Sequence, residues 1–455
     1  MKKTALLLLI LIFAVASASL VLAGGCEEKY DRYTTVNIYD AEDFFENSYE
    51  HNFNIMADID FGGAEINSIV AGYVYGNGHT ISNVRIEGNA FFTEGDVRDL
   101  NFENVTLVCK GTGDAGIVAK EGDFQNVSVK NSSIEITGSE KGRLYVGGIC
   151  GTVRERMKGC GAENVSISAI AAETTSSSYG GYLQVGGLFG YAEFESVIEE
   201  SYAKDCDIYA EGNHPSCQVR AGGAAGCING GSTVRALYAR GCSVSAVNTW
   251  YYRRYEGATV TAGGTVGFLA AGDSVGKVSL SFSEDNELFV RSSQTYRAGG
   301  FVGYSDFLMN NCYASGNTIT AYLSNIDKKG GGVRVVAGLA GLIDRGVSNC
   351  FAAENEASAY LSGGSVDETA SAAGLVAARS NTSTYVVRSA VKDNKSAAGN
   401  VYEISGFCRG GCFSTGEDGV DASVWSDRGA IRELLWLYDK HWDFSGETPK
   451  LVFDF

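Results

Sequence analysis

The chain has few of the residues that mark stalks and basic binding surfaces. It has only two prolines among 455 residues, Pro215 and Pro449, which excludes a proline-rich stalk. Lysine and arginine total 36 against 54 aspartates and glutamates, which gives a formal charge of −18. Because nucleic-acid binding requires a concentrated basic surface, this balance argues against a nucleic-acid partner. An acidic surface also repels anionic lipid headgroups.

Histidine is also scarce, with four scattered residues at positions 51, 79, 214 and 441. None of them has the spacing of metal ligands. The sequence contains no His-Glu-x-x-His, no nucleophile elbow, no P-loop and no dinucleotide-binding fingerprint. We therefore expect no metal, no cofactor and no catalytic residues.

Glycine, in contrast, is abundant, with 59 residues. An intact Gly-Gly-x-x-Gly motif occurs five times, at 147–151, 186–190, 222–226, 263–267 and 299–303. Degenerate copies stand at 338–341, 374–377 and 406, and a leading one at 116. The copies recur every 32 to 41 residues. A period in this range is typical of a solenoid, in which each repeat covers only its neighbours.

Each motif is followed by a short segment in which apolar and polar residues alternate, as at 164–169, 206–210, 242–246 and 317–321. Alternation is the period of a half-buried strand. Such strands pair in parallel with the same strand of the next coil, about 4.8 Å away. The sequence therefore predicts an all-β fold, a right-handed parallel β-helix of about ten coils over residues 71–422. Tyr191, Phe268 and Tyr304, each directly after its motif, should form an aromatic ladder.

The segments outside the repeats are predicted to cap the solenoid, because its terminal strands would otherwise be bare. Residues 27–70 form the N-terminal cap, where Asp40 begins a short helix whose Phe44 and Phe45 face inward. Residues 423–455 form the C-terminal cap. Apolar residues at 431, 434, 435 and 438 predict an amphipathic helix there.

Residues 1–26 have the pattern of a secretory signal, with two lysines before an apolar run at 5–22. Cleavage after Ala23 would release a soluble protein. Alternatively, residues 22–26 resemble a bacterial lipobox, and Cys26 would carry lipid. An uncleaved membrane anchor is a third, weaker alternative, since 18 apolar residues are just long enough to span. We expect an exported protein, secreted or lipid-anchored at the cell surface or outer envelope, and a monomer.

The chain has twelve cysteines, and several recur at one position of the repeat. Cys206 and Cys242 share one such position, as do the cysteines at 312 and 350. Parallel stacked side chains need a strained geometry to form a disulfide, so we expect buried thiols. Cys408 and Cys412 are close enough in sequence to close a small loop and form the candidate disulfide.

A family resemblance rests on three stretches. Residues 54–61 and 76–84 precede the Gly-Gly-Leu-x-Gly copies, and a Trp-Asp-Phe segment with a later Pro-x-Leu ends the chain. Together these resemble the GLUG-repeat family over roughly residues 35–455. The resemblance implies an exported, adhesin-like β-helix protein. Similar repeats are also appended to IgA-type proteases, but no protease motif is present here.

The candidate binding site is the segment before each motif, because these segments share one phase of the repeat and should emerge on one side. The most unusual is the run Trp250, Tyr251, Tyr252, Arg253, Arg254 and Tyr255. Aromatic rings stack on sugars, and arginine forks pair with carboxylates or sulfates. Arg220, Arg297 and Arg334 stand at nearly equivalent positions and would prolong a basic stripe. The alternative is a solvated loop folded over its neighbours.

Asp58 and Asp60 followed by His79 allow a further interpretation as a carboxylate pair with an acid–base group. Hydrogen bonding in a cap and a turn explains the same residues more simply. The main hypothesis is a non-catalytic, adhesin-like protein that binds a glycan or a host or partner surface. The alternatives are a polysaccharide lyase or glycoside hydrolase on a β-helix, and a purely structural spacer.

Overall fold

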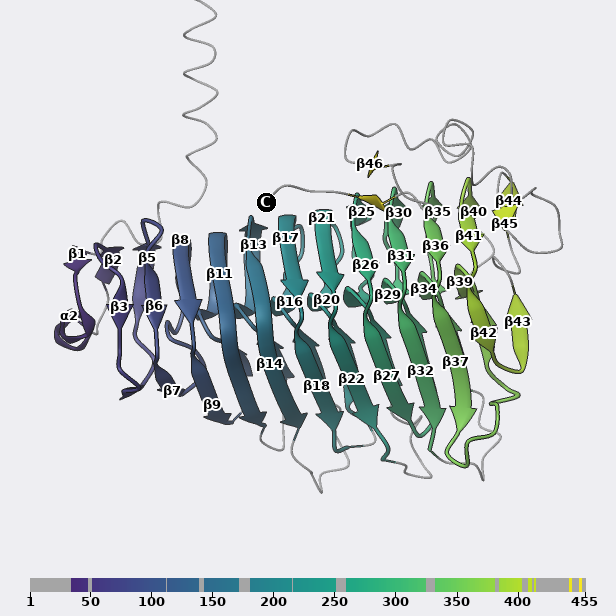
Figure 1. Cartoon of the computed structure of the whole chain (residues 1–455), viewed down its shortest axis with the longest axis horizontal. Coiled ribbons are helices and arrows are strands. Elements are labelled where there is room, and N and C mark those ends of the chain that lie inside the picture. The colour runs from purple at the N-terminus through teal and green to yellow at the C-terminus, as the bar shows by residue number, and fades with distance from the viewer. Residues whose placement is uncertain are drawn as a thin grey trace, which may run out of the picture.

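The computed structural model describes thirteen stretches of the chain, and its strands lie side by side along one long axis (Figure 1). These stretches are residues 34–47, 51–111, 113–138, 143–171, 181–214, 216–250, 259–324, 332–380, 384–402, 408–410, 413–414, 442–443 and 450–451. Nearly all described strands belong to two sheets, of 36 and nine strands. Neighbouring strands within both sheets pair in parallel, as in β12–β15 and β22–β27.

The nine-stranded sheet contains the strand that leads into each glycine motif. Its members are β10 (Gly113–Gly116), β12 (Arg143–Gly147), β15 (Tyr182–Gly186), β19 (Gln218–Gly222), β23 (Thr259–Gly263), β28 (Thr295–Gly299), β33 (Arg334–Ala337), β38 (Ser371–Ala373) and β43 (Asn400–Tyr402).

Short strands of the large sheet follow the motif. They are β16 (Phe189–Ala192), β20 (Ala225–Ile228), β24 (Val266–Leu269), β29 (Val302–Ser305), β34 (Ala340–Ile343) and β39 (Val376–Arg379). The longer β11 (Ala119–Thr137) and β13 (Cys150–Lys158) take this place in the first repeats.

The same sheet continues into a broad row of strands at the front of Figure 1. This row contains β9 (Thr106–Lys110), β14 (Gly161–Ala171), β18 (Asp207–Gly212), β22 (Ser243–Asn248), β27 (Glu287–Ser292), β32 (Thr318–Leu323), β37 (Glu356–Leu361) and β42 (Lys395–Ala397).

Between these two rows run the remaining strands of the repeats. They are β8 (Asp96–Glu103), β17 (Val197–Lys204), β21 (Thr233–Arg240), β25 (Lys277–Ser279), β26 (Phe282–Glu284), β30 (Leu308–Asn310), β31 (Tyr313–Ser315), β35 (Val347–Ser348), β36 (Phe351–Ala353), β40 (Val386–Val387), β41 (Ala390–Lys392), β44 (Cys408–Gly410) and β45 (Phe413–Ser414).

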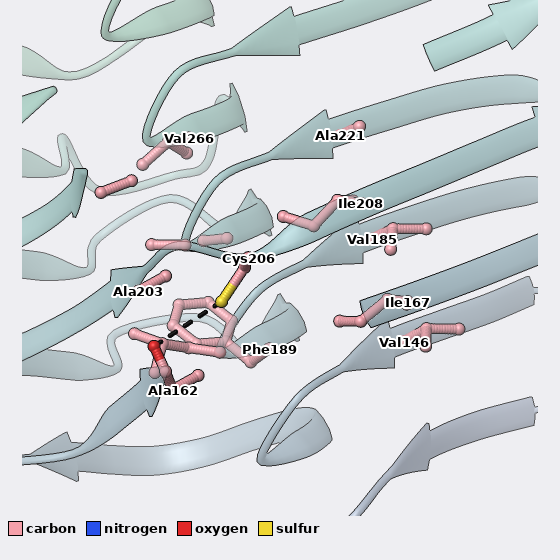
Figure 2. Packing of buried hydrophobic residues seen from close by; sticks show 14 of the residues in the cluster. Val146, Ala162, Ile167, Val185, Phe189, Ala203, Cys206, Ile208, Ala221 and Val266 are labelled. Atoms are coloured by element: carbon pink, nitrogen blue, oxygen red, sulfur yellow. Dashed lines mark hydrogen bonds between the residues drawn. The ribbon is translucent and has the colours of Figure 1, made fainter. Parts of the chain in front are cut away.

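The core forms because equivalent residues of successive repeats stack in register. Val146 pairs with Val185, and Val185 with Ala221, all fully buried. Ile167 and Ile208 do the same on the front strands (Figure 2). Since strand side chains alternate between two faces, this register keeps one apolar face inside over the whole length. The expected all-β solenoid with parallel strands is confirmed.

Cysteines fill small slots of this core. Nine cysteines in the described stretches are buried free thiols, including Cys206 and Cys242, as expected. Figure 2 shows Cys206 beside Phe189 and Ala203, with its thiol directed at the carbonyl oxygen of Ala162, 3.6 Å away. Cys408 begins β44, and Cys26 and Cys412 lie outside the described residues, so the lipidation and the disulfide stay predictions.

A buried asparagine ladder continues the same turn through later repeats. Asn286 donates its side-chain amide to Asn317 Oδ1 at 3.1 Å, and Asn317 donates to Asn355 Oδ1 at 2.8 Å. Their side-chain oxygens also accept backbone N–H groups. For example, the backbone N–H of Cys242 donates to Asn286 Oδ1. Buried polar groups must be paired, and each amide satisfies both its own groups and the backbone of the preceding repeat.

The chain before the repeats begins with β1 (Thr35–Ile38), α2 (Ala41–Glu46) and β2 (His51–Ile55). Asp40 caps α2 in a capping box with Asp43, and Phe44 is fully buried, as expected. The expectation for Phe45 is wrong, because its side chain is 53% exposed. The adjacent short strands are β3 (Ile59–Asp60), β4 (Glu65–Ile66), β5 (Ala71–Tyr75), β6 (Thr80–Ser82) and β7 (Arg85–Glu87).

The described part of the C-terminal segment lies against the side of the repeats. β46 (Trp442–Asp443) and β47 (Lys450–Leu451) pair antiparallel. Trp442 packs on Phe351 and Tyr313, with ring centroids 5.5 and 6.0 Å apart. These two rings belong to a stacked row with Phe282, in which centroids lie about one repeat apart at 4.9 and 5.2 Å. The predicted helix near 431–438 lies outside the described residues.

Candidate functional site: the corner at the glycine motif

The glycine motif makes a corner where two backbones come into contact. A Cβ built on Gly190, the last glycine of its motif, would lie 2.3 Å from the backbone nitrogen of Val146. At Gly226 the corresponding distance to the nitrogen of Val185 is 2.5 Å. Only glycine permits such an approach. The strand before the motif and the strand after it therefore bring their outer side chains together.

Two stacked positions line the outside of this corner, and we call them together the corner strip. The first is the residue three places before the second glycine, whose members are Asp114, Tyr145, Gln184, Arg220, Thr261, Arg297, Val335 and Ser371. The second is the residue directly after the motif, whose members are Thr152, Tyr191, Cys227, Phe268, Tyr304, Leu342 and Ala378.

Aromatic rings fill the strip at its N-terminal part. Tyr145 stacks on Tyr191 with centroids 4.6 Å apart and an interplanar angle of 27°. The guanidinium of Arg143 lies 5.2 Å from the centre of the Tyr145 ring. Asn229 donates its side-chain amide to the hydroxyl of Tyr191. Desolvation by burial raises the pKa of Tyr191 to about 12, so this phenol stays neutral at physiological pH.

The expected aromatic ladder of Tyr191, Phe268 and Tyr304 is only partly formed. Phe268 and Tyr304 stack at 4.4 Å and 18°, but Cys227 stands between Tyr191 and Phe268 in the register. The guanidinium of Arg220 lies over the Phe268 ring at 3.8 Å and also 4.9 Å from the Tyr182 ring. A cation on a ring face is favourable, so arginine replaces the missing ring.

Arg220 makes two polar contacts with its guanidinium group. Its Nη2 donates to Gln218 Oε1 at 3.0 Å, and its Nη1 contacts Cys227 Sγ at 3.4 Å. Among the described residues no carboxylate lies within 4 Å of this guanidinium. Its charge is held by neutral groups and ring faces.

Arg297 stands two repeats further along and also lies over an aromatic ring. Its guanidinium lies 5.2 Å from the Tyr304 ring centre, and its buried Nε has no hydrogen-bond partner among the described residues. Burial lowers the pKa of Arg297, and the charge of Arg220 lowers it further, while Tyr304 and Asp344 raise it. The cation is therefore short of partners, which an anion would supply.

Carboxylates at both ends of the strip are already engaged. Asp114 accepts from Thr152 Oγ1 at 2.8 Å and lies 3.7 Å from Arg143 Nε. At the other end the Tyr304 hydroxyl donates to Asp344 Oδ2 at 2.5 Å. The positive charge that remains is concentrated between these ends, at Arg220 and Arg297.

Arg334 does not extend this stripe, which corrects the expectation from sequence. Arg334 pairs with Tyr296, not with Arg297, so it stands one residue out of register. It is 6% exposed, donates from Nε to the Gln294 carbonyl oxygen at 3.1 Å and lies 3.9 Å from Asp367. A shift of one residue turns a strand side chain to the other face.

The predicted aromatic loop is described only at its first residue. Trp250 follows β22 and is 40% exposed, and its carbonyl oxygen accepts from Ser293 Oγ at 2.6 Å. Tyr251 to Tyr255 lie outside the described residues, so their role stays a prediction. Arg220 and Arg297, in contrast, lie on β19 and β28. Tyr145, Tyr182 and Gln184 were not predicted, although Tyr145 and Gln184 share the motif phase of Arg220.

The carboxylates near His79 behave as turn residues. Asp58 accepts from the backbone N–H of Thr80 at 2.9 Å and lies 3.2 Å from His79 Nδ1. These two hydrogen bonds lower the pKa of Asp58, and an amide of Asn83 with the N–H of Gly62 lowers that of Asp60. Groups held ionised in turns are poor proton donors, which agrees with the simpler interpretation.

One other carboxylate has the opposite character. Asp96 is 7% exposed, and burial followed by the charge of Asp123 raises its pKa to about 6. The N–H of Asp123 donates to Asp96 Oδ1 at 3.3 Å. Nearby, Arg154 Nη2 binds Glu94 and Glu121 at 2.7 and 2.9 Å. Asp96 is thus a carboxylic acid that keeps its proton at a higher pH than an ordinary aspartate does.

Within the described stretches no group of three or more His, Cys, Asp or Glu residues could hold a metal ion. Nor does any helix in that part of the chain have the length and apolar character needed to cross a membrane.

Comparison with known proteins finds one family and loosely similar structures. The family described as "The GLUG motif" matches residues 294–320, which run from β28 into β32 and include the intact motif at 299–303. No curated protein matches the chain.

Among solved structures, a candidate immunoglobulin A1 protease from Bacteroides ovatus is 16% identical, with 92% of each chain covered and a TM-score of 0.33. The catalytic domain of a GH87 alpha-1,3-glucanase in complex with tetrasaccharides is 12% identical, with 86% of this chain and 69% of that chain covered and a TM-score of 0.27. Likeness at this level transfers neither an activity nor a substrate.

Proposed function

We propose that this chain, which matches the GLUG motif at residues 294–320, is a non-catalytic, adhesin-like binding protein that recognises a glycan or a partner surface from one side of its solenoid. The proposal includes a right-handed winding of about ten coils with a cap at each end. It also includes export, with Cys26 as the lipid anchor of a monomer at the cell envelope.

The observation that supports binding is the pair of guanidinium groups in the corner strip. Arg220 and Arg297 lie half-buried against ring faces, and no described carboxylate is within 4 Å of either. A cation buried without an anion is unfavourable for folding, so its presence is better explained by a ligand than by stability. Trp250 precedes β23 in the sequence, and Thr261 of β23 lies between the two arginines.

A glycan array of neutral and acidic polysaccharides tests this proposal on the mature chain. We expect bound glycans whose signal falls in the double variant Arg220→Gln and Arg297→Gln. Arg291→Gln is the control, because Arg291 is exposed on β27 and the change is the same arginine-to-glutamine substitution away from the strip. Replacing Trp250 by Ala tests whether the loop contributes. Equal signals for all variants would contradict the proposed site.

A glycan-cleaving enzyme is the second candidate, favoured by Asp96. Glycoside hydrolases use one carboxylic acid with a raised pKa beside a second carboxylate, and Asp96 with Asp123 has that electrostatic character. A reducing-end assay across the same polysaccharides tests it. Product that is lost in Asp96→Asn but kept in the control Asp60→Asn would favour the enzyme.

A further inference from the structure

The spacing of the two arginines specifies the ligand more closely. Arg220 pairs with Thr261, and Thr261 with Arg297, so the guanidinium groups stand two repeats apart. Parallel strands are about 4.8 Å apart, which places the two strand positions about 10 Å from each other along the axis. Thr261 between them is 1% exposed and neutral. The strip therefore offers two cations that are separated by one neutral position.

The Phe268 ring, which lies between the two arginines, is unavailable for stacking on sugars. Tyr304, in the next repeat, stacks on one face of Phe268 at 4.4 Å, and Arg220, from the preceding repeat, covers the other at 3.8 Å. Neutral glycans are bound mainly through such open ring faces. Recognition at this site must rely on charge and hydrogen bonds.

The guanidinium groups still have donors to offer. An arginine carries five N–H bonds, of which Arg220 uses two, to Gln218 and Cys227. Ring contacts fix the plane of each guanidinium, so little side-chain entropy is lost when it binds. A carboxylate accepts two parallel N–H bonds from such a fork.

Resting on the proposed function, we propose that Arg220 and Arg297 bind carboxylates on alternate sugars of an extended acidic glycan that lies along the solenoid axis. Two successive sugars of an extended chain span a length comparable to two repeats, so one carboxylate in each disaccharide matches both arginines. The engaged carboxylates Asp114 and Asp344 bound the site, which limits it to two anionic groups.

Calorimetric titration of the mature chain tests this with three probes. A hyaluronan octasaccharide has a carboxylate on every second sugar, an oligogalacturonate has one on every sugar, and a chitooligosaccharide has none. We expect the hyaluronan fragment to bind most tightly. Arg220→Gln and Arg297→Gln should each weaken it about tenfold or more, because each removes a charge-assisted pair. Arg291→Gln should leave it unchanged.

Lysine variants keep the test informative if a glutamine variant misfolds. Arg297→Lys retains the charge but loses the planar fork, so a partial loss of affinity supports bidentate binding. Equal affinity for oligogalacturonate would overturn the alternating match. Binding of the chitooligosaccharide alone, unaffected by the arginine variants, would overturn this inference and leave a glycan-binding function standing. If no glycan bound here or on the array, the proposed function would fail with it.

Discussion

The corner at the glycine motif predicts a stability loss that can be separated from the general effect of replacing glycine. In Gly190→Ala the new Cβ would lie 2.3 Å from Val146 N, 2.6 Å from the carbonyl carbon of Tyr145 and 2.8 Å from the Gln184 oxygen. All three are backbone atoms of paired strands, so no side chain can rotate away. Overpacking of this kind typically costs about 1 to 3 kcal/mol, and we expect the upper end.

Gly363→Ala supplies the matched control. Gly363 has no heavy atom within 4 Å of its added Cβ and no positive φ. Both variants restrict the unfolded chain equally, which stabilises the folded protein by about 0.4 to 1 kcal/mol in each. The difference between their unfolding free energies therefore isolates the cost of the close backbone contact at Gly190.

Because a solenoid unfolds by repeats and not as one unit, guanidinium melts should be combined with hydrogen exchange of β12, β15 and β16. We expect a lower midpoint and faster exchange in these strands only for Gly190→Ala. Equal midpoints for the two variants would refute the close-approach argument.

Three further changes have defined outcomes. Asn317→Ala breaks the buried ladder and removes the oxygen that accepts the buried backbone N–H of Asn286, so the unfolding free energy should fall by roughly 2 to 3 kcal/mol in denaturant melts. Asp96 has a folded pKa of about 6 against 3.8 unfolded, so its contribution to stability is present below pH 4 and is lost as pH rises through 6. Asp96→Asn should therefore gain stability over the wild type at pH 7.5, by roughly 3 kcal/mol, and much less at pH 4; an equal difference at both pH values would contradict this. Trp442→Ala removes a ring 6% exposed on Phe351 and should release the C-terminal segment to limited proteolysis while the repeats stay resistant.

The solenoid could be predicted from the sequence because its physical cause is periodic. A glycine pair every 32 to 41 residues marks a place in each repeat where two backbones approach so closely that no Cβ fits between them. Apolar residues at a constant distance from it then stack in register, as Val146, Val185 and Ala221 do. Neither step depends on contacts between distant, unrelated segments.

The sequence also predicts which face of its strand a residue occupies, when residues are counted back from the second glycine of the motif. The wrong expectation for Arg334 shows how exact this count must be. Arg220 and Arg297 stand three residues before the second glycine of their motifs, whereas Arg334 stands four residues before Gly338. One residue decides between the outer face and the interior of a strand. A nearly equivalent position in the repeat is therefore not enough to predict the face of the strand. Arg334 is buried and lies beside the buried carboxylate of Asp367.

The side-chain contacts at the corner could not be predicted in the same way, because some lie within one repeat and others join two neighbouring repeats. Arg297 lies over Tyr304 of its own motif, whereas Arg220 leans over Phe268, which belongs to the next one. The difference follows from Cys227, which is too small to cover the Phe268 face and leaves it to the guanidinium. A period specifies which residues are equivalent, but side-chain size decides which of them meet. The site therefore depends on the exceptions within the repeat, at Cys227 and at the neutral Thr261 that separates the two charges.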